Sequence, residues 1–450
     1  MMMKTSLFVV LISLACLRTA TGGPQLDDKV RAIVEQKVRD GELPSLVIAV
    51  RDGDANAIYA FGKVGAAPPD GRTVYEIGSI TKTFSALLLA QAVVSGQVRL
   101  DDPLGQVVPA YARLALAARP VTLLDLATQT SGLPRLPGNL APADMADPYV
   151  DYDRAALKAF LANYTLTRAP GSQYEYSNLG TGLLGDVLAE RERTSYPALV
   201  AERITGPLGM TSTGMGGMGT MLSSPAMAIG HDAAGKPVRN WNFDALAGAG
   251  ALHANADDML RYLQAMMDGG KVAGSPIKLA QTPQRDTGTA DTRIALNWHL
   301  SKVNQQVMVW HNGMTGGYAS FIGFTEDGRR GVVVLTNTAR TVDQIGLTTL
   351  FPELAAPAAA ATDTVPPAIL ASYAGRFELA PGFVLTIEPA AGGLRVQATG
   401  QPAFSATASG TDTFQVPDVG ASLTFKRNTQ GEVDGVTLRQ NGRELPGRKL

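Results

Sequence analysis

The chain has 450 residues, of which 45% are hydrophobic and 18% are charged, and its formal net charge at pH 7 is −1. This length is enough for two or three domains with a substantial buried core. A charge so close to neutral gives no electrostatic reason to expect nucleic acid or an anionic membrane surface as a partner. Composition therefore indicates a globular protein that does not bind nucleic acid.

The first 22 residues have the pattern of a secretory signal. Lys4 precedes an apolar run over residues 7–17, and small residues follow as far as Gly22. We expect cleavage near Gly22 and secretion of the rest of the chain. The apolar run is too short to span a bilayer, and no later stretch reaches spanning length without charges, so no membrane span is expected.

Cys16, the single cysteine of the chain, lies inside this segment. We interpret it as an apolar residue that is removed with the signal. The alternative is a lipid anchor on Cys16, but Ser13 is a poor residue for the start of a lipoprotein signal. In either case the secreted part forms no disulfide, and secretion with so few cysteines is typical of a bacterial periplasm.

Strand patterns open the region 26–354. Apolar residues recur with helical spacing over residues 30–38, and strands are expected at 46–50 and 57–61, joined by a turn at 51–54. The residues that follow the second strand lead to a long apolar helix.

Helices and loops occupy most of residues 101–283, including a helix that Asn255 is expected to cap. Strands return at 307–310, 319–325 and 331–336. Strands at both ends with helices between them indicate an α+β fold, in which one sheet is built from both ends of this region. We expect the active site between the sheet and the helical part.

Beyond the last of these strands, residues 355–367 are rich in alanine and proline and indicate a linker. From 368 to 450 the pattern is all β, which predicts a small antiparallel barrel or sandwich. We interpret this part as an accessory lid or stabilising domain without chemistry of its own. Its expected strands include 383–387, 394–398, 404–408, 422–425 and 436–440.

Ser79 and Lys82 lie one helical turn apart at the start of the long apolar helix. This spacing puts a hydroxyl and an amine on one face, which pairs a nucleophile with a proton acceptor. The signal is weak alone, because a serine has lysine three positions on with odds of roughly one in twenty. Ser275 and Lys278 repeat it. A helix-capping Ser79 and a solvated Lys82 are therefore the competing interpretation.

Two further motifs follow along the chain and favour catalysis. Tyr176 is the only one of the 12 tyrosines with an asparagine, Asn178, two residues on. His311 begins a His-Asn-Gly sequence that ends at Gly313, after an apolar strand pattern. No tyrosine with an asparagine two residues on follows Ser275. Ser275 therefore cannot be the serine of a site in which the serine–lysine motif comes first along the chain.

The three ordered motifs resemble those of the penicillin-recognising serine hydrolases, which include class C β-lactamases, serine DD-peptidases, and related esterases and amidases. The resemblance extends over about residues 26–354 and includes the stretches 123–134, 207–210 and 256–259. It implies a β-lactamase/transpeptidase-like fold, with an antiparallel sheet flanked by helices and an inserted helical domain. It also implies cleavage of amide bonds through an acyl-serine intermediate, with D-Ala-D-Ala-type cell-wall peptides, β-lactams or both as substrates.

The resemblance assigns a role to each residue of the first two motifs. Ser79 is the expected nucleophile, and Lys82 is expected to take or relay its proton. Tyr176 is the expected general acid and base, which requires that the charge of Lys82 lower the pKa of the phenol. Asn178 is expected to hold Lys82 and to bind the substrate amide.

The third motif is expected to bind substrate along a strand edge. His311 is expected to donate a proton to Tyr176 or to bind a substrate carboxylate, and Gly313 to allow close approach of the substrate. The backbone N–H groups of Ser79 and Met314 are the expected oxyanion hole.

Two positions depart from relatives within this resemblance. His311 stands where class C β-lactamases have lysine, as in DD-peptidases and some esterases and amidases, which counts against an efficient β-lactamase. Gln129 stands where many relatives have histidine before Thr-Ser-Gly. We expect only a local change in hydrogen bonding there.

Other signals are discounted and two alternatives stay open. The glycine-rich stretch 214–219 matches a dinucleotide fingerprint, but it does not join a strand to a helix. The four histidines lack metal-ligand spacing, and neither a metal nor another cofactor is expected. An esterase that acts on small acyl esters and a non-catalytic peptidoglycan-binding protein remain as alternative functions.

Overall fold

The computed structural model describes residues 23–450. The residues excepted from this range are 113–114, 117–118, 217–226, 356–364, 381–382, 391, 400–402, 417–420 and 441–442. The expected signal at 1–22, with Cys16, therefore lies outside the described residues. Among those described, no helix is both long and apolar enough to cross a membrane.

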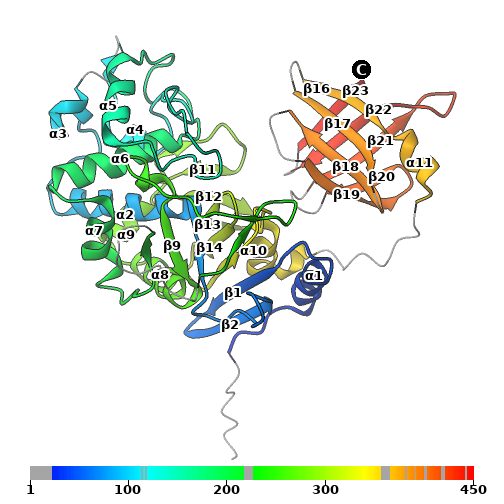
Figure 1. The fold of residues 1–450 in the computed structure, drawn as a ribbon, viewed down its shortest axis with the longest axis horizontal. Helices are drawn as coiled ribbons and strands as arrows, with labels where there is room; N and C mark the ends of the chain where they lie inside the picture. The colour runs from blue at the N-terminus through cyan, green and yellow to red at the C-terminus, as the bar shows by residue number, and fades with distance from the viewer. Residues whose placement is uncertain are drawn as a thin grey trace, which may run out of the picture.

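One eight-stranded antiparallel sheet, in the order β10-β11-β12-β13-β14-β15-β1-β2, frames the first part of the chain (Figure 1). Strands from the two ends of this part meet where β1 pairs with β15, as predicted. The strands are β1 (Ser45–Asp52), β2 (Ala55–Gly62), β10 (Arg285–Asp286), β11 (Thr292–Ile294), β12 (His299–Val303), β13 (Gln306–Met314), β14 (Ala319–Thr325) and β15 (Arg330–Thr336).

Alternate residues of β1 pack on opposite faces of this sheet, as the pleat requires. Val47 and Ala49 belong to the larger core with helices α2 (Thr81–Val94) and α8 (Ala256–Gly269). Leu46, Ile48 and Val50 belong to a second core with α1 (Asp28–Arg39) and α10 (Asp343–Leu350). Because both faces are covered, the central strands β1, β14 and β15 are buried along almost their whole length rather than at every second residue.

The helical part is inserted between β2 and β10 and packs around α2, whose residues are almost all buried. Asn255 caps α8 as predicted, since its side chain accepts a hydrogen bond from Asp258 N–H. The remaining helices are α3 (Leu104–Val107), α4 (Leu123–Ala127), α5 (Arg154–Asn163), α6 (Asn178–Arg191), α7 (Tyr196–Val200) and α9 (Pro276–Gln281), with the short turns η1 (Gly78–Ile80), η2 (Pro109–Tyr111), η3 (Ala201–Thr205), η4 (Ala247–Ala249) and η5 (Pro352–Leu354).

Three small sheets accompany these helices. The strand order β3-β9-β6 gives the largest of them, and β3 leads directly into η1. The strands are β3 (Val74–Glu76), β4 (Ala115–Leu116), β5 (Arg119–Pro120), β6 (Gly214–Met215), β7 (Gly230–His231), β8 (Pro237–Val238) and β9 (Leu252–Asn255).

The C-terminal part is all β, as predicted, and its eight strands close into a barrel (Figure 1). Apolar side chains fill the barrel interior, and α11 (Pro367–Ser372) precedes it. The domain limits at 354/355 and 367/368 stay predictions. The strands are β16 (Gly375–Ala380), β17 (Phe383–Ala390), β18 (Gly393–Ala398), β19 (Ala403–Gly410), β20 (Thr413–Val416), β21 (Ala421–Arg427), β22 (Val433–Gln440) and β23 (Arg443–Lys449).

Candidate active site

Ser79 lies in η1, immediately before α2, in a turn held against the large sheet. The Ser320 hydroxyl of β14 donates to the carbonyl oxygen of Ile77 over 2.8 Å. Gly78 has a φ of +48°, and a Cβ on this residue would lie only 2.8 Å from the backbone nitrogen of Met314. Glycine is therefore required here, both for the left-handed backbone and for close contact with β13.

Lys82 lies one turn after Ser79, and its side chain is fully buried. Its Nζ is 2.9 Å from Ser79 Oγ, 2.9 Å from Asn178 Oδ1 and 2.6 Å from the carbonyl oxygen of Ala249. None of these partners carries a negative charge. Burial therefore lowers the pKa of Lys82 well below its usual value, and the positive charge of Arg135 lowers it further. A neutral amine at this position can accept the hydroxyl proton of Ser79.

The carbonyl of Ala249 reaches Lys82 because two glycines meet behind it. A Cβ on Gly185 of α6 would lie 2.8 Å from the Cα of Gly248 in η4. Without side chains at these positions, η4 packs directly on α6, the helix that begins with Asn178. Two of the three oxygen partners of Lys82, those of Asn178 and Ala249, are thus fixed relative to each other.

Tyr176 lies close to Lys82, with its ring centroid 4.8 Å from Nζ. Burial raises the pKa of this phenol well above its usual value, and the hydrogen bond with Ser79 and the charge of Arg135 offset that rise only in part. The expected lowering of this pKa is therefore wrong, because burial outweighs the groups that lower it. Tyr176 is a protonated phenol, so it can donate a proton to a leaving group.

Gln129 holds the segment that carries Tyr176. Its side-chain oxygen accepts the Ser177 N–H over 2.7 Å, and its backbone oxygen accepts the Glu175 N–H over 2.7 Å. Both neighbours of Tyr176 are thus tied to one buried residue. We expected only a local change at this position, but the bonds extend to the Tyr-x-Asn segment, and no sequence signal links two residues so far apart.

Met314 presents its backbone N–H to the site. The Thr315 N–H donates to Tyr318 oxygen over 3.0 Å, and Met314 pairs with Ala319 in the adjacent position of the ladder. Bonded and non-bonded pairs alternate in an antiparallel ladder, so the Met314 N–H points away from β14. Met314 and Ser79 line the same cleft, and their N–H groups stay the predicted oxyanion hole.

His311 is buried in β13 and is neutral. Its Nδ1 lies 2.6 Å from the carbonyl oxygen of Asn312, so Nδ1 carries the proton and donates it. Burial lowers the pKa of the ring well below its usual value, and Nε2 has no hydrogen-bond partner among the described residues. Nε2 therefore presents a lone pair, which suits neither of the expected roles, proton donor to Tyr176 or ligand for a carboxylate.

Gly313 serves packing rather than substrate access. A Cβ on this residue would lie 2.0 Å from the carbonyl oxygen of Ile77 and 2.4 Å from Ser320 Oγ. The missing side chain lets β13 touch the turn of Ser79. The expectation that Gly313 makes room for the substrate is corrected accordingly.

An aromatic wall that the sequence did not reveal lines the cleft beside Ser79 and Met314. Tyr149 stacks on Phe243 with ring centroids 4.6 Å apart, and Trp241 meets Tyr149 edge-on at 5.3 Å. The cleft encloses about 20 Å³, room for roughly one water molecule. These residues come from separate loops without motifs, which is why sequence reasoning missed them.

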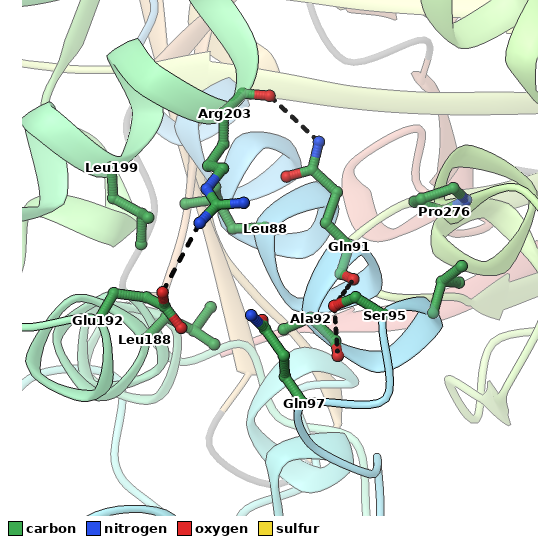
Figure 2. Close-up of a pocket in the computed structure, with 11 residues that line it drawn as sticks. Leu88, Gln91, Ala92, Ser95, Gln97, Leu188, Glu192, Leu199, Arg203 and Pro276 are labelled. Carbon is green, nitrogen blue, oxygen red and sulfur yellow. Dashed lines mark hydrogen bonds and ion pairs between the residues drawn. The ribbon is translucent and has the colours of Figure 1, made fainter.

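A larger hollow of about 320 Å³ lies elsewhere, along the C-terminal half of α2 (Figure 2). There Glu192 pairs with Arg203 over 3.7 Å, and Gln91 donates to the Arg203 carbonyl oxygen. Its charged groups are satisfied, and no proposed catalytic residue lines it. Within the described part of the chain, no group of three or more His, Cys, Asp or Glu side chains could hold a metal ion.

A buried lysine against a serine hydroxyl, set between an antiparallel sheet and a helical layer, is an arrangement that suits a nucleophilic serine. The chain belongs to the beta-lactamase family, whose model matches residues 30–350. A second model, a domain of unknown function (DUF3471), matches residues 359–449. The chain is thus a member of the family that its three ordered motifs resemble, as predicted.

Two bacterial relatives are similar over different lengths. The D-alanyl-D-alanine-carboxypeptidase/endopeptidase AmpH of Escherichia coli (strain K12) is 33% identical over 227 residues, which are 49% of this chain and 56% of AmpH. The chain thus matches little more than half of that relative. A beta-lactamase of the same organism is 26% identical over 379 residues, which are 75% of this chain and 95% of that enzyme.

Two solved structures support the fold. The octameric penicillin-binding protein homologue from Pyrococcus abyssi has a TM-score of 0.67 at 21% identity, covering 93% of this chain and 99% of that one. A class C beta-lactamase has a TM-score of 0.62 at 24% identity, and the match covers 73% of this chain and 95% of the chain of that enzyme. The first likeness includes the C-terminal part, whereas the second does not extend over the whole chain.

Proposed function

We propose that this protein cleaves amide bonds through an acyl intermediate on Ser79, acting on D-Ala-D-Ala-type peptides, β-lactams or both. The observation that carries the proposal is the 2.9 Å contact between Ser79 Oγ and the uncompensated, buried Nζ of Lys82. A serine cap with a solvated lysine would leave that amine in water. The names of the relatives, beta-lactamase and D-alanyl-D-alanine-carboxypeptidase, support this substrate class.

Acylation follows from the protonation states. The neutral amine of Lys82 takes the proton from Ser79 as its oxygen attacks the substrate carbonyl carbon. The N–H groups of Ser79 and Met314 stabilise the negative oxygen of the tetrahedral intermediate. The phenol of Tyr176 gives its proton to the leaving nitrogen as the carbon–nitrogen bond breaks, and the proton on Lys82 then restores the phenol.

Deacylation reverses the proton transfers with water as the nucleophile. Lys82, neutral again, accepts a proton from the attacking water through Tyr176 or directly, and Ser79 leaves with a proton. Asn178 keeps the amine in position during both halves through its 2.9 Å contact with Nζ. His311 contributes an acceptor at Nε2, which suits an N–H group of a peptide substrate.

We further propose that residues 1–22 direct the protein to the bacterial periplasm and that 26–354 and 368–450 are separate domains joined by 355–367. The apolar run of the first segment and the alanine- and proline-rich composition of the linker support these limits. In a periplasm the enzyme would meet cell-wall peptides.

The test is the intact mass of the protein over time after addition of benzylpenicillin, with Ser79→Ala alongside. A lasting adduct on the wild type alone would indicate a penicillin-binding DD-peptidase with slow deacylation. Consumption of the drug with free enzyme would indicate a β-lactamase. Neither adduct nor consumption, together with turnover of small esters, would favour the esterase alternative, and turnover by Ser79→Ala would refute the proposed nucleophile.

A further inference from the structure

Arg135 places a positive charge beside Tyr176 that no acid among the described residues neutralises. Its guanidinium carbon lies 5.1 Å from the ring centroid of Tyr176, and the residue is exposed. Within the described parts of the chain its guanidinium has neither an ion pair nor a hydrogen bond, whereas Arg119, for example, pairs with the buried Asp125. An unpaired arginine beside a proposed proton donor is available to bind an anionic group of the substrate.

The backbone of Arg135 is fixed to the catalytic segment. The Ser177 hydroxyl donates to the Pro134 carbonyl oxygen over 2.6 Å, and the Leu179 N–H donates to the Arg135 carbonyl oxygen over 3.2 Å. The backbone that carries the guanidinium is therefore positioned by Ser177 and Leu179, the residues on either side of Asn178. Only its side chain is free to adjust to a ligand.

The other basic groups of the site cannot serve an anion. Lys82 is buried with its amine occupied by three oxygen atoms. His311 presents a lone pair at Nε2, which would repel a carboxylate. Arg135 also acts to lower the pKa of both Lys82 and Tyr176, so its field reaches both proposed catalytic groups.

We infer that Arg135 binds the substrate carboxylate carried by the carbon atom that is bonded to the scissile nitrogen. This inference rests on the proposed function. A D-alanyl leaving group and the five-membered ring of a penicillin share this feature: the carboxylate is two bonds from the nitrogen that Tyr176 protonates. A guanidinium beside Tyr176 matches that position and can bind a carboxylate through two parallel hydrogen bonds.

The experiment compares substrates that differ only in this charge. One pair is an acylated D-alanyl-D-alanine peptide and its C-terminal carboxamide; the other is benzylpenicillin and its methyl ester. The kcat/KM ratio of charged to neutral form is measured for the wild type, Arg135→Gln and Arg135→Lys. The control is Arg31→Gln, because Arg31 also lies over an aromatic ring, 5.3 Å from Tyr59, but on the opposite face of the sheet.

We expect Arg135→Gln to lower this ratio by about 10- to 100-fold, Arg135→Lys to recover part of it, and Arg31→Gln to leave it unchanged. If the ratio falls for the peptide pair, Arg135 binds the carboxylate of the D-alanyl leaving group. If it falls for the penicillin pair, Arg135 binds the carboxylate of the β-lactam. The acid limb of the pH profile should also move to higher pH in Arg135→Gln, because the charge that lowers the pKa of Lys82 is gone. A ratio near one in the wild type, or an unchanged ratio in Arg135→Gln, would overturn the inference.

Failure of the proposed function gives a different pattern. An enzyme that hydrolyses p-nitrophenyl acetate but neither peptide nor penicillin would refute amide cleavage, and the inference is then tested by competition. The carboxylate forms should inhibit ester hydrolysis more strongly than the neutral forms, and Arg135→Gln should remove that difference. Equal inhibition by both forms in the wild type would refute carboxylate binding by Arg135.

Discussion

Replacing Gln129 with alanine should release Tyr176 from the fold. Beyond its bonds to the neighbours of Tyr176, Gln129 donates to Thr181 Oγ1 over 2.9 Å and to Asn297 Oδ1 over 2.8 Å. The residue is 2% exposed, so water cannot replace the lost partners in place. Alanine would leave the Ser177 N–H buried without an acceptor.

The cost can be worked out from these bonds. An unsatisfied buried donor costs about 1–3 kcal/mol, and the loss of the two bonds donated by the amide adds about 1 kcal/mol. Asn297 Oδ1 still accepts a hydrogen bond from Thr181 Oγ1 over 3.2 Å, so the loss of the bond from Gln129 costs less there. We therefore expect Gln129→Ala to lower the free energy of unfolding by about 2–4 kcal/mol. A displacement of Tyr176 by about 1 Å should lower kcat about 100-fold.

The assay combines denaturant unfolding with kcat for an acyl ester. Gln129→His should retain both stability and kcat, because neutral imidazole has one donor and one acceptor. Leu263→Ala in α8, fully buried, is the control for stability alone: it should cost about 2–5 kcal/mol and spare kcat. The reasoning fails if Gln129→Ala keeps its kcat, or if Leu263→Ala loses as much activity for the same loss of stability.

Two further changes test the surroundings of the site. Burial raises the pKa of Glu76, whose side chain accepts the Trp241 N–H, from 4.5 to about 7. The folded state thus holds a proton that the unfolded chain loses between these values, and stability falls as pH rises through this range. Between pH 4 and pH 8, the free energy of unfolding of Glu76→Gln, measured with denaturant, should rise by about 3 kcal/mol relative to that of the wild type. A difference between the two proteins that does not change with pH would contradict this. Gly313→Ala should lose acylation by an active-site fluorophosphonate and unfold at a lower temperature, because its Cβ would meet the Ile77 oxygen. Gly138→Ala, whose Cβ would have one neighbour at 3.7 Å, should change neither.

The strands and the α+β arrangement were predictable from the sequence because their signals are local. The run at residues 331–336, for example, contains three valines and a leucine in succession after a turn, which favours a buried strand. The three motifs were recognisable for the same reason, since each is short and fixed in spacing. Their order along the chain then pointed to one site.

The charge states were not predictable, because they depend on what surrounds a side chain in space. Lys82 and His311 are both bases in the sequence, but the fold buries each without a carboxylate among the described residues, and this burial lowers the pKa of both well below the usual values. The aromatic wall and Gln129 were missed or underrated because their contacts join loops far apart in the chain. Arg135 was passed over because an exposed arginine in a loop is ordinary until its missing partner is seen.

The site therefore sets protonation by burial rather than by ion pairing. An acid beside Lys82 would keep that amine protonated and unable to accept the proton of Ser79, so the lack of a carboxylate partner is a requirement of the mechanism. The same burial removes positive charge from the substrate side of β13, where His311 stands. A charged substrate must then find its counterion at the rim, where water limits the cost of an unpaired cation, and Arg135 stands there over Tyr176. Catalysis and recognition thus need opposite environments, and the fold supplies both beside one tyrosine: Lys82 is buried and Arg135 is exposed, and each lies near the ring of Tyr176.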